Sequence, residues 1–164
     1  MPTFVERRIV NPLLAILRQG TTPRMLACSL ACGVVCGVFP VVGATTILCF
    51  GAAFLFRLNQ PAAQLVNYLI YPLQLVLILP FIRAGAGVLR MQGTHLSLQQ
   101  LIAIFRHDGG HALPILWRLA VEGIVAWALI APFLFATVYW LVLPPIRRMA
   151  RLIAERRQAA VVLP

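Results

Sequence analysis

The chain has 164 residues, of which 61% are hydrophobic and only 11% are charged, and its mean hydropathy is +0.90. A water-soluble domain of this size needs a more polar surface, so the composition predicts an all-α integral membrane protein. The net charge of +10 comes from arginine alone. In so apolar a chain, this charge favours arginines that flank membrane helices and contact anionic headgroups over arginines that bind nucleic acid.

The N-terminal segment does not resemble a signal peptide, because Arg7, Arg8 and Pro12 interrupt any apolar core. Its apolar and basic residues instead predict an amphipathic helix over 3–18 that lies on the membrane surface. Gly20 ends that helix.

Residues 25–56 carry no charged side chain. As a single helix they would run roughly 48 Å, which is too long for one crossing of a bilayer core about 30 Å thick and short for two. Pro40 removes a backbone donor, and Gly37 and Gly43 permit a sharp change of direction, so we predict a broken helical hairpin. Its two helices cover about 24–38 and 43–56.

Small side chains recur every fourth residue along the first hairpin helix. They are Cys28, Cys32 and Cys36 on one face and Ser29, Gly33 and Gly37 on the next. Such faces let membrane helices approach closely, so we expect helix packing and a homo-oligomer. A metal or redox stripe is the alternative interpretation, but no histidine lies near in sequence, and we predict no metal and no cofactor.

The next predicted helix, about 61–82, begins after a cap at Asn59 or Gln60. Its polar side chains Gln64, Asn67, Tyr71 and Gln74 fall on one helical face. Lipid cannot satisfy such groups, so the face is expected to meet other helices. Two interpretations stay open: hydrogen bonds that hold the bundle together, or the lining of a binding cavity. The predicted helix breaks in this half of the chain are Gly37, Pro40, Gly43, Pro61 and Pro72.

Four motifs in this region resemble a known family. They are Thr22-Pro23-Arg24, the segment GVVCGVFPVVG at 33–43, Arg57-x-Asn59-x-Pro61, and the proline-broken helix that follows. Over about 18–90 the chain resembles the DUF2062 family of bacterial membrane proteins. Many members carry asparagine directly before the second helix-breaking proline, where this chain has Tyr71. Some members are fused to glycosyltransferase-like domains, so the resemblance implies a connection with glycan assembly.

The second half of the chain is expected to hold one more membrane helix, over 117–143, with a kink at Pro132. A short amphipathic helix over 98–106 precedes it, and an arginine-rich surface helix over 147–157 follows it. Arg118 and Glu122 can pair across one helical turn. Trp127, Tyr139 and Trp140 are expected to anchor near headgroups. The residues His107, Asp108 and His111 read as a solvated turn, with a metal or acid–base cluster as the alternative.

Basic clusters at 7–24, 83–118 and 147–157 constrain the topology. We predict a multi-pass protein of the bacterial inner membrane with both termini in the cytoplasm, and re-entrant half-helices as the alternative. The whole chain, 1–164, forms one membrane domain, with a core over 18–90 and the last helix and basic tail in 91–164.

No catalytic constellation is visible, so we predict that the protein is not an enzyme. The preferred function is binding or translocation of a lipid-like or small anionic substrate at the broken-helix ends. The alternative is an accessory or scaffold subunit of a membrane complex in glycan or envelope assembly. The expected partners are membrane lipids, above all anionic headgroups, and a membrane protein, with no nucleic acid. The predicted substrate site comprises Gly43, Thr45, Thr46, Arg57, Asn59, Asn67, Tyr71 and Gln74.

Overall fold

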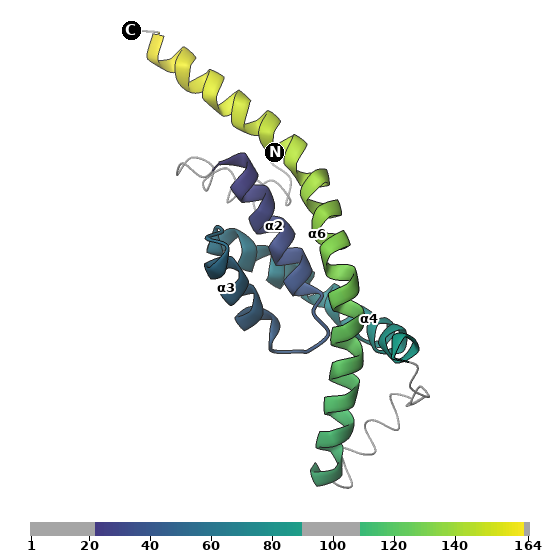
Figure 1. Cartoon of the computed structure of the whole chain (residues 1–164). Helices are drawn as coiled ribbons and strands as arrows, with labels where there is room; N and C mark the ends of the chain where they lie inside the picture. The colour runs from purple at the N-terminus through teal and green to yellow at the C-terminus, as the bar shows by residue number, and fades with distance from the viewer. Residues whose placement is uncertain (1–21, 90–108, 163–164) are drawn as a thin grey trace.

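The computed structural model describes residues 22–89 and 109–162, and these segments are almost entirely helical. The helices are α2 (Pro23–Gly37), α3 (Thr45–Leu55), α4 (Gln60–Val88) and α6 (Gly109–Val162). In Figure 1, α2 and α3 form a hairpin on one side of the long helix α6, and α4 crosses behind them. The predicted helical class is therefore confirmed over the described residues.

The hairpin break lies between Gly37 and Thr45. Helix α2 begins after Thr22, whose side chain accepts a hydrogen bond from the Met25 amide, and it ends at Gly37. The connection includes Pro40 and then Gly43. The backbone of Gly43 has a φ of 87°, which residues with a Cβ rarely adopt. The predicted break around Pro40 is thus present, with its second helix starting two residues later than expected.

Helix α4 starts where its cap was expected and then runs further than predicted. The Asn59 side chain accepts a hydrogen bond from the Ala62 amide at 3.0 Å, and Pro61 lies in the first turn. Pro61 therefore begins a helix rather than breaking one. The helix continues through Pro72 and Pro80, so the predicted break at Pro72 is wrong. A proline removes only its own amide from the hydrogen-bond ladder, and an apolar helix that packs on neighbours tolerates that loss.

Helix α6 is one continuous helix of 54 residues, roughly 80 Å along its axis, and it bends toward its C-terminal end (Figure 1). It begins at Gly109, before the predicted start at 117, and passes through Pro132 and through Pro144 and Pro145. The predicted separate tail helix is therefore wrong, because the tail continues α6 without a break (Figure 1). The predicted helices over 3–18 and 98–106, together with His107 and Asp108, lie outside the described residues, as does the side chain of His111.

Glycines set the closest approaches between the helices. A Cβ at Gly33 would collide with the Ala63 carbonyl of α4, and a Cβ at Gly37 would lie 3.0 Å from the Ile70 Cβ. The small-residue face of α2 thus contacts α4 of the same chain. Gly33 and Gly37 are occupied by this contact within the chain, so their spacing is not evidence for contact between two chains. The homo-oligomer stays a prediction.

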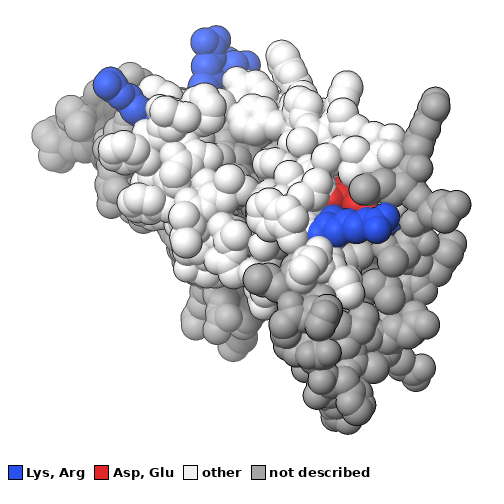
Figure 2. All heavy atoms as spheres, turned by 60° about the horizontal axis from the view of Figure 1, so that its bottom comes forward, with Lys and Arg blue, Asp and Glu red and all other residues white. Residues whose placement is uncertain are grey.

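The outer surface is strongly apolar. Ile47 is 77% exposed and Phe54 is 73% exposed, both on α3. Helices α4 and α6 are long and apolar enough to span a membrane, and only 17% and 22% of their most apolar stretches are buried inside the protein. On the face shown in Figure 2 uncharged side chains dominate, and acidic atoms lie directly against basic ones. Such a surface suits lipid better than water.

Candidate functional site: a cavity at the hairpin break

A cavity of about 390 Å³ lies between the start of α3 and the middle of α4. It is lined by Val42, Gly43, Thr45, Thr46, Asn67, Tyr68 and Tyr71. Gly43, both threonines, Asn67 and Tyr71 belong to the predicted substrate site, and the fold brings them together. Tyr68 was missed because it lies beside the polar stripe; its place one helical turn before Tyr71 was the available signal.

The N-terminal end of α3 opens beside this cavity without a side-chain cap. The N-cap residue is Ala44, which offers no side-chain acceptor, and the first amide of the regular ladder is that of Leu48, which donates to the Ala44 carbonyl at 2.9 Å. The amides of Thr45 and Thr46 therefore precede the helical ladder. A helix N-terminus carries about half a positive charge, so this end of the break attracts anions.

The C-terminal end of α2, across the same break, is closed by protein donors. The Trp127 indole Nε1 donates to the Val35 carbonyl at 2.9 Å, and the Gln74 Nε2 donates to the Phe39 carbonyl at 2.8 Å. Backbone amides satisfy the carbonyls of Val34 and Cys36. The negative end of the break is thus occupied from α4 and α6, while no side chain of the described residues caps the positive end.

Trp127 therefore has a role that the sequence did not indicate. It was expected near headgroups, but it joins α6 to α2 and meets the Phe39 ring edge-to-face at 4.9 Å between ring centroids. Because the two residues of its hydrogen bond are 92 positions apart, sequence periodicity carries no signal for this contact.

The polar stripe of α4 both bonds the helices together and lines the cavity. Gln64 Nε2 donates to the Thr46 carbonyl at 3.1 Å, so this side chain holds α4 to α3. The Gln64 Oε1 then accepts from Asn67 Nδ2 at 3.4 Å. Asn67 is only 3% exposed, and its Oδ1 has no hydrogen-bond partner among the described residues. Asn67 thus borders the cavity, while its unused acceptor is buried in the protein.

Three residues of the predicted substrate site do not line this cavity. Arg57 lies in the turn after α3, where its φ is 52° and its side chain is exposed. Asn59 caps α4, and its backbone amide donates to the Ser29 Oγ at 2.8 Å. Gln74 is bonded to the Phe39 carbonyl. Asn59 and Gln74 hold the fold around the break, and Arg57 belongs to the opposite end of α3.

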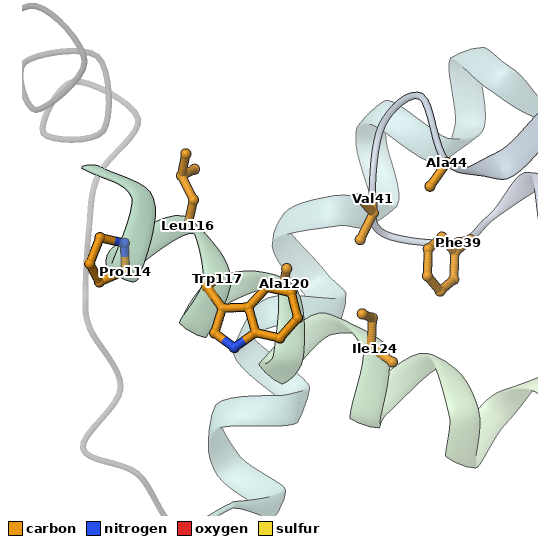
Figure 3. Close-up of a pocket in the computed structure, with 8 residues that line it drawn as sticks. All are labelled: Phe39, Val41, Ala44, Pro114, Leu116, Trp117, Ala120 and Ile124. Carbon is orange, nitrogen blue, oxygen red and sulfur yellow. The ribbon is translucent and has the colours of Figure 1, made fainter. Parts of the chain in front are cut away.

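A second, larger hollow of about 700 Å³ lies on the other side of the break, toward α6. Figure 3 shows its lining, with Phe39, Val41 and Ala44 from the break facing residues of the first turns of α6. The α6 residues are Pro114, Leu116, Trp117, Ala120 and Ile124. Every lining side chain is apolar apart from the indole N–H of Trp117, so this hollow suits hydrocarbon.

The expected pair of Arg118 and Glu122 is present near this end of α6. Arg118 Nε lies 3.3 Å from Glu122 Oε1, and the Glu122 side chain is 1% exposed. The Glu122 backbone meets Gly85 of α4, and the next residue, Gly123, faces Pro40. The ion pair thus lies at the point where α4, α6 and the hairpin break meet.

Three of the four cysteines form part of the packed core, and Cys28 is partly exposed. Cys32, Cys36 and Cys49 lie in one buried cluster, and the Sγ atoms of the first two are 3.9 Å apart. Among residues 22–89 and the described part of α6, no group of three or more His, Cys, Asp or Glu side chains is placed to hold a metal ion.

Replacing Trp127 with phenylalanine is expected to lower the free energy of unfolding by about 1–3 kcal/mol, because the Val35 carbonyl loses its buried donor. The matched control is Trp140→Phe, since Trp140 is 69% exposed. Unfolding of detergent-solubilised protein, followed by tryptophan fluorescence or circular dichroism, measures both. Equal losses in the two variants would show that the Trp127 hydrogen bond does not hold α6 to α2.

Comparison with known proteins places the chain in a family. Its sequence matches the family described as "uncharacterized protein conserved in bacteria (DUF2062)" over residues 6–154, well beyond the 18–90 segment that carries the motifs. No match was found among curated proteins or among solved structures. The match spans most of the chain, and the protein therefore belongs to the DUF2062 family.

Proposed function

We propose that this protein is a multi-pass protein of the bacterial inner membrane that binds or translocates a lipid-like or small anionic substrate at the start of α3. One observation carries the proposal: the negative end of the hairpin break is capped by Trp127 and Gln74, whereas the positive end opens uncapped beside a cavity. A cation would find its carbonyls already occupied, while an anion meets free backbone amides.

Helix lengths support a location within the membrane. Helix α2 has 15 residues and α3 has 11, so they are about 22 Å and about 16 Å long, both short of a bilayer core about 30 Å thick. We infer that the hairpin is re-entrant and that α4 and α6 cross fully. The break then lies at membrane depth, where a low dielectric strengthens the attraction between the α3 terminus and an anion.

In this proposal the residues of the cavity bind and orient the anion and do not react with it. The first-turn amides of α3 and the hydroxyls of Thr45 and Thr46 donate to the anion, and Tyr68 and Tyr71 form the exposed rim of the cavity. The protein then acts as a binder or carrier and not as an enzyme.

A second candidate function rests on the far half of α6, where the arginines at 147, 148 and 151 are exposed. These cations suit an accessory or scaffold role, engaging a membrane-protein partner or anionic lipid. Crosslinking in native membranes that recovers only self-links would exclude the partner role.

Native mass spectrometry of the delipidated protein with added anionic phospholipid tests the main proposal. Wild type is expected to retain lipid, and Asn67→Leu and Thr46→Val are each expected to lower occupancy about tenfold, the effect of losing about 1.4 kcal/mol. Gln60→Leu is the matched control, since Gln60 belongs to the same helix but bonds to the Phe50 carbonyl outside the cavity. Arg57→Ala is expected to retain lipid too.

The control variants also show how the proposal fails. If all variants retain lipid as wild type does, the cavity is not the binding site. If Arg57→Ala loses lipid while Asn67→Leu keeps it, the anion binds at the α3–α4 turn instead.

A further inference from the structure

Exposed side chains on one face of α6 follow the order of depth in a phospholipid leaflet. Phe133, Trp140, Arg147 and Arg151 are all exposed. The last three lie seven, fourteen and eighteen residues after Phe133, which is close to two, four and five helical turns, so the four side chains share a face. Along this face a hydrocarbon ring comes first, then an indole, and then two cations.

The spacing of these side chains matches the thickness of one leaflet. Phe133 and Arg147 are roughly 21 Å apart along the helix, and half of a bilayer with its headgroups is about 20–22 Å thick. Indole rings lie at the boundary between hydrocarbon and headgroups, and arginine reaches the phosphates. One phospholipid can therefore lie along this face, with its acyl chain on Phe133 and its phosphate at the arginines.

A second exposed indole marks the opposite boundary of the membrane. Trp117 precedes Trp140 by 23 residues, or roughly 34 Å of helix, which is close to the bilayer core of about 30 Å. Gly123, which contacts Pro40, follows Trp117 by roughly 9 Å along α6. The hairpin break therefore falls between the two indoles, as the proposed re-entrant hairpin requires.

The charge at the Arg147 end of the molecule is positive. Leu26 of α2 and Ile146 of α6 lie in one buried cluster, so the exposed Arg24 lies at the same end as Arg147. The acidic side chain that the described residues place at this end is Glu155, eight residues beyond Arg147. Arginines therefore outnumber acids here, which suits the anionic cytoplasmic leaflet.

We propose that this face of α6 binds an anionic phospholipid of the cytoplasmic leaflet, with the phosphate at Arg147 and Arg151 and the acyl chain along Trp140 and Phe133. The inference rests on the proposed position of α6 across the membrane, and it assigns these arginines to lipid rather than to a protein partner. It does not involve the cavity at the hairpin break.

Quenching of Trp140 by brominated lipid tests this site in a bilayer. The full chain carrying Trp117→Phe is reconstituted in phosphatidylcholine with a fixed fraction of phosphatidylglycerol, and either lipid carries the bromines. A Trp117→Phe, Trp140→Phe protein gives the background from Trp127. Brominated phosphatidylglycerol is expected to quench Trp140 more strongly at equal mole fraction, and Arg147→Gln is expected to lower that preference about fivefold.

Arg83→Gln is the matched control, because Arg83 is exposed near the other end of α4. It is expected to leave the preference of Trp140 for phosphatidylglycerol unchanged, as is Asn67→Leu in the cavity. Equal quenching by both lipids would overturn the lipid site, would favour a protein partner for the arginines, and would leave the membrane location intact. A loss of preference in Arg83→Gln equal to that in Arg147→Gln would also overturn it. If neither lipid quenches Trp140, the proposed membrane location itself is wrong.

Discussion

A single methyl group added at Gly85 is expected to prevent stable folding. The Cβ of alanine at this position would collide with the backbone carbonyl of Glu122, where α4 crosses α6. Backbone atoms cannot rotate away as a side chain can, so the two helices must separate. We expect Gly85→Ala to lower the free energy of unfolding by about 3 kcal/mol or more, at the upper end for overpacking.

Gly87 offers the control, two residues along the same helix. A Cβ there meets nothing within 4 Å, so Gly87→Ala is expected to fold as wild type does. Expression level and detergent unfolding curves measure both variants. If Gly85→Ala is as stable as Gly87→Ala, the close crossing of α4 and α6 is not part of the fold.

Gly33→Leu is expected to have the next largest effect, again about 3 kcal/mol or more, because the leucine side chain would enter the contact between α2 and the Ala63 carbonyl of α4. Gly51→Leu is its control, since a Cβ at Gly51 meets nothing within 4 Å on α3. Gly33→Leu should unfold the protein and not merely dissociate an oligomer, because the Gly33 contact with Ala63 lies within one chain.

Light scattering on the detergent-solubilised protein, combined with an unfolding curve, distinguishes these outcomes. A folded Gly33→Leu protein of reduced mass would show that the glycine face joins two copies of the chain. An unfolded or unexpressed Gly33→Leu protein beside a folded Gly51→Leu protein supports the intrachain contact.

The two prolines at the predicted breaks show what the sequence can and cannot predict. Pro40 is flanked by Gly37 and Gly43, and the chain does leave the helix there, with a positive φ at Gly43. Pro72 has no glycine within three residues on either side, and α4 passes through it unbroken. A proline on its own does not predict a break, because packing on both sides can hold the helix across the missing hydrogen bond.

The candidate site was predictable where helical spacing determined it. Asn67 and Tyr71 are one turn apart on α4, so they lie on the same helical face. Thr45 and Thr46 are the first two residues of α3, so they lie together at its N-terminal end. Arg57 comes twelve residues after Thr45, which is about 18 Å along a helix, so the two residues lie at opposite ends of α3. The capping of Val35 by Trp127 was not predictable, because it depends on how α6 packs against the hairpin.

Helix α6 is held by α2 along much of its length. Trp127 donates to the Val35 carbonyl, and Leu143 and Ile146 lie in one buried cluster with Leu26 and Ala27 of α2. Beyond Ile146 the helix continues to Val162 for roughly 24 Å and carries exposed arginines at 147, 148 and 151. Any tilt of α2 that accompanies a rearrangement of the break would therefore move the base of this arginine-bearing segment with it.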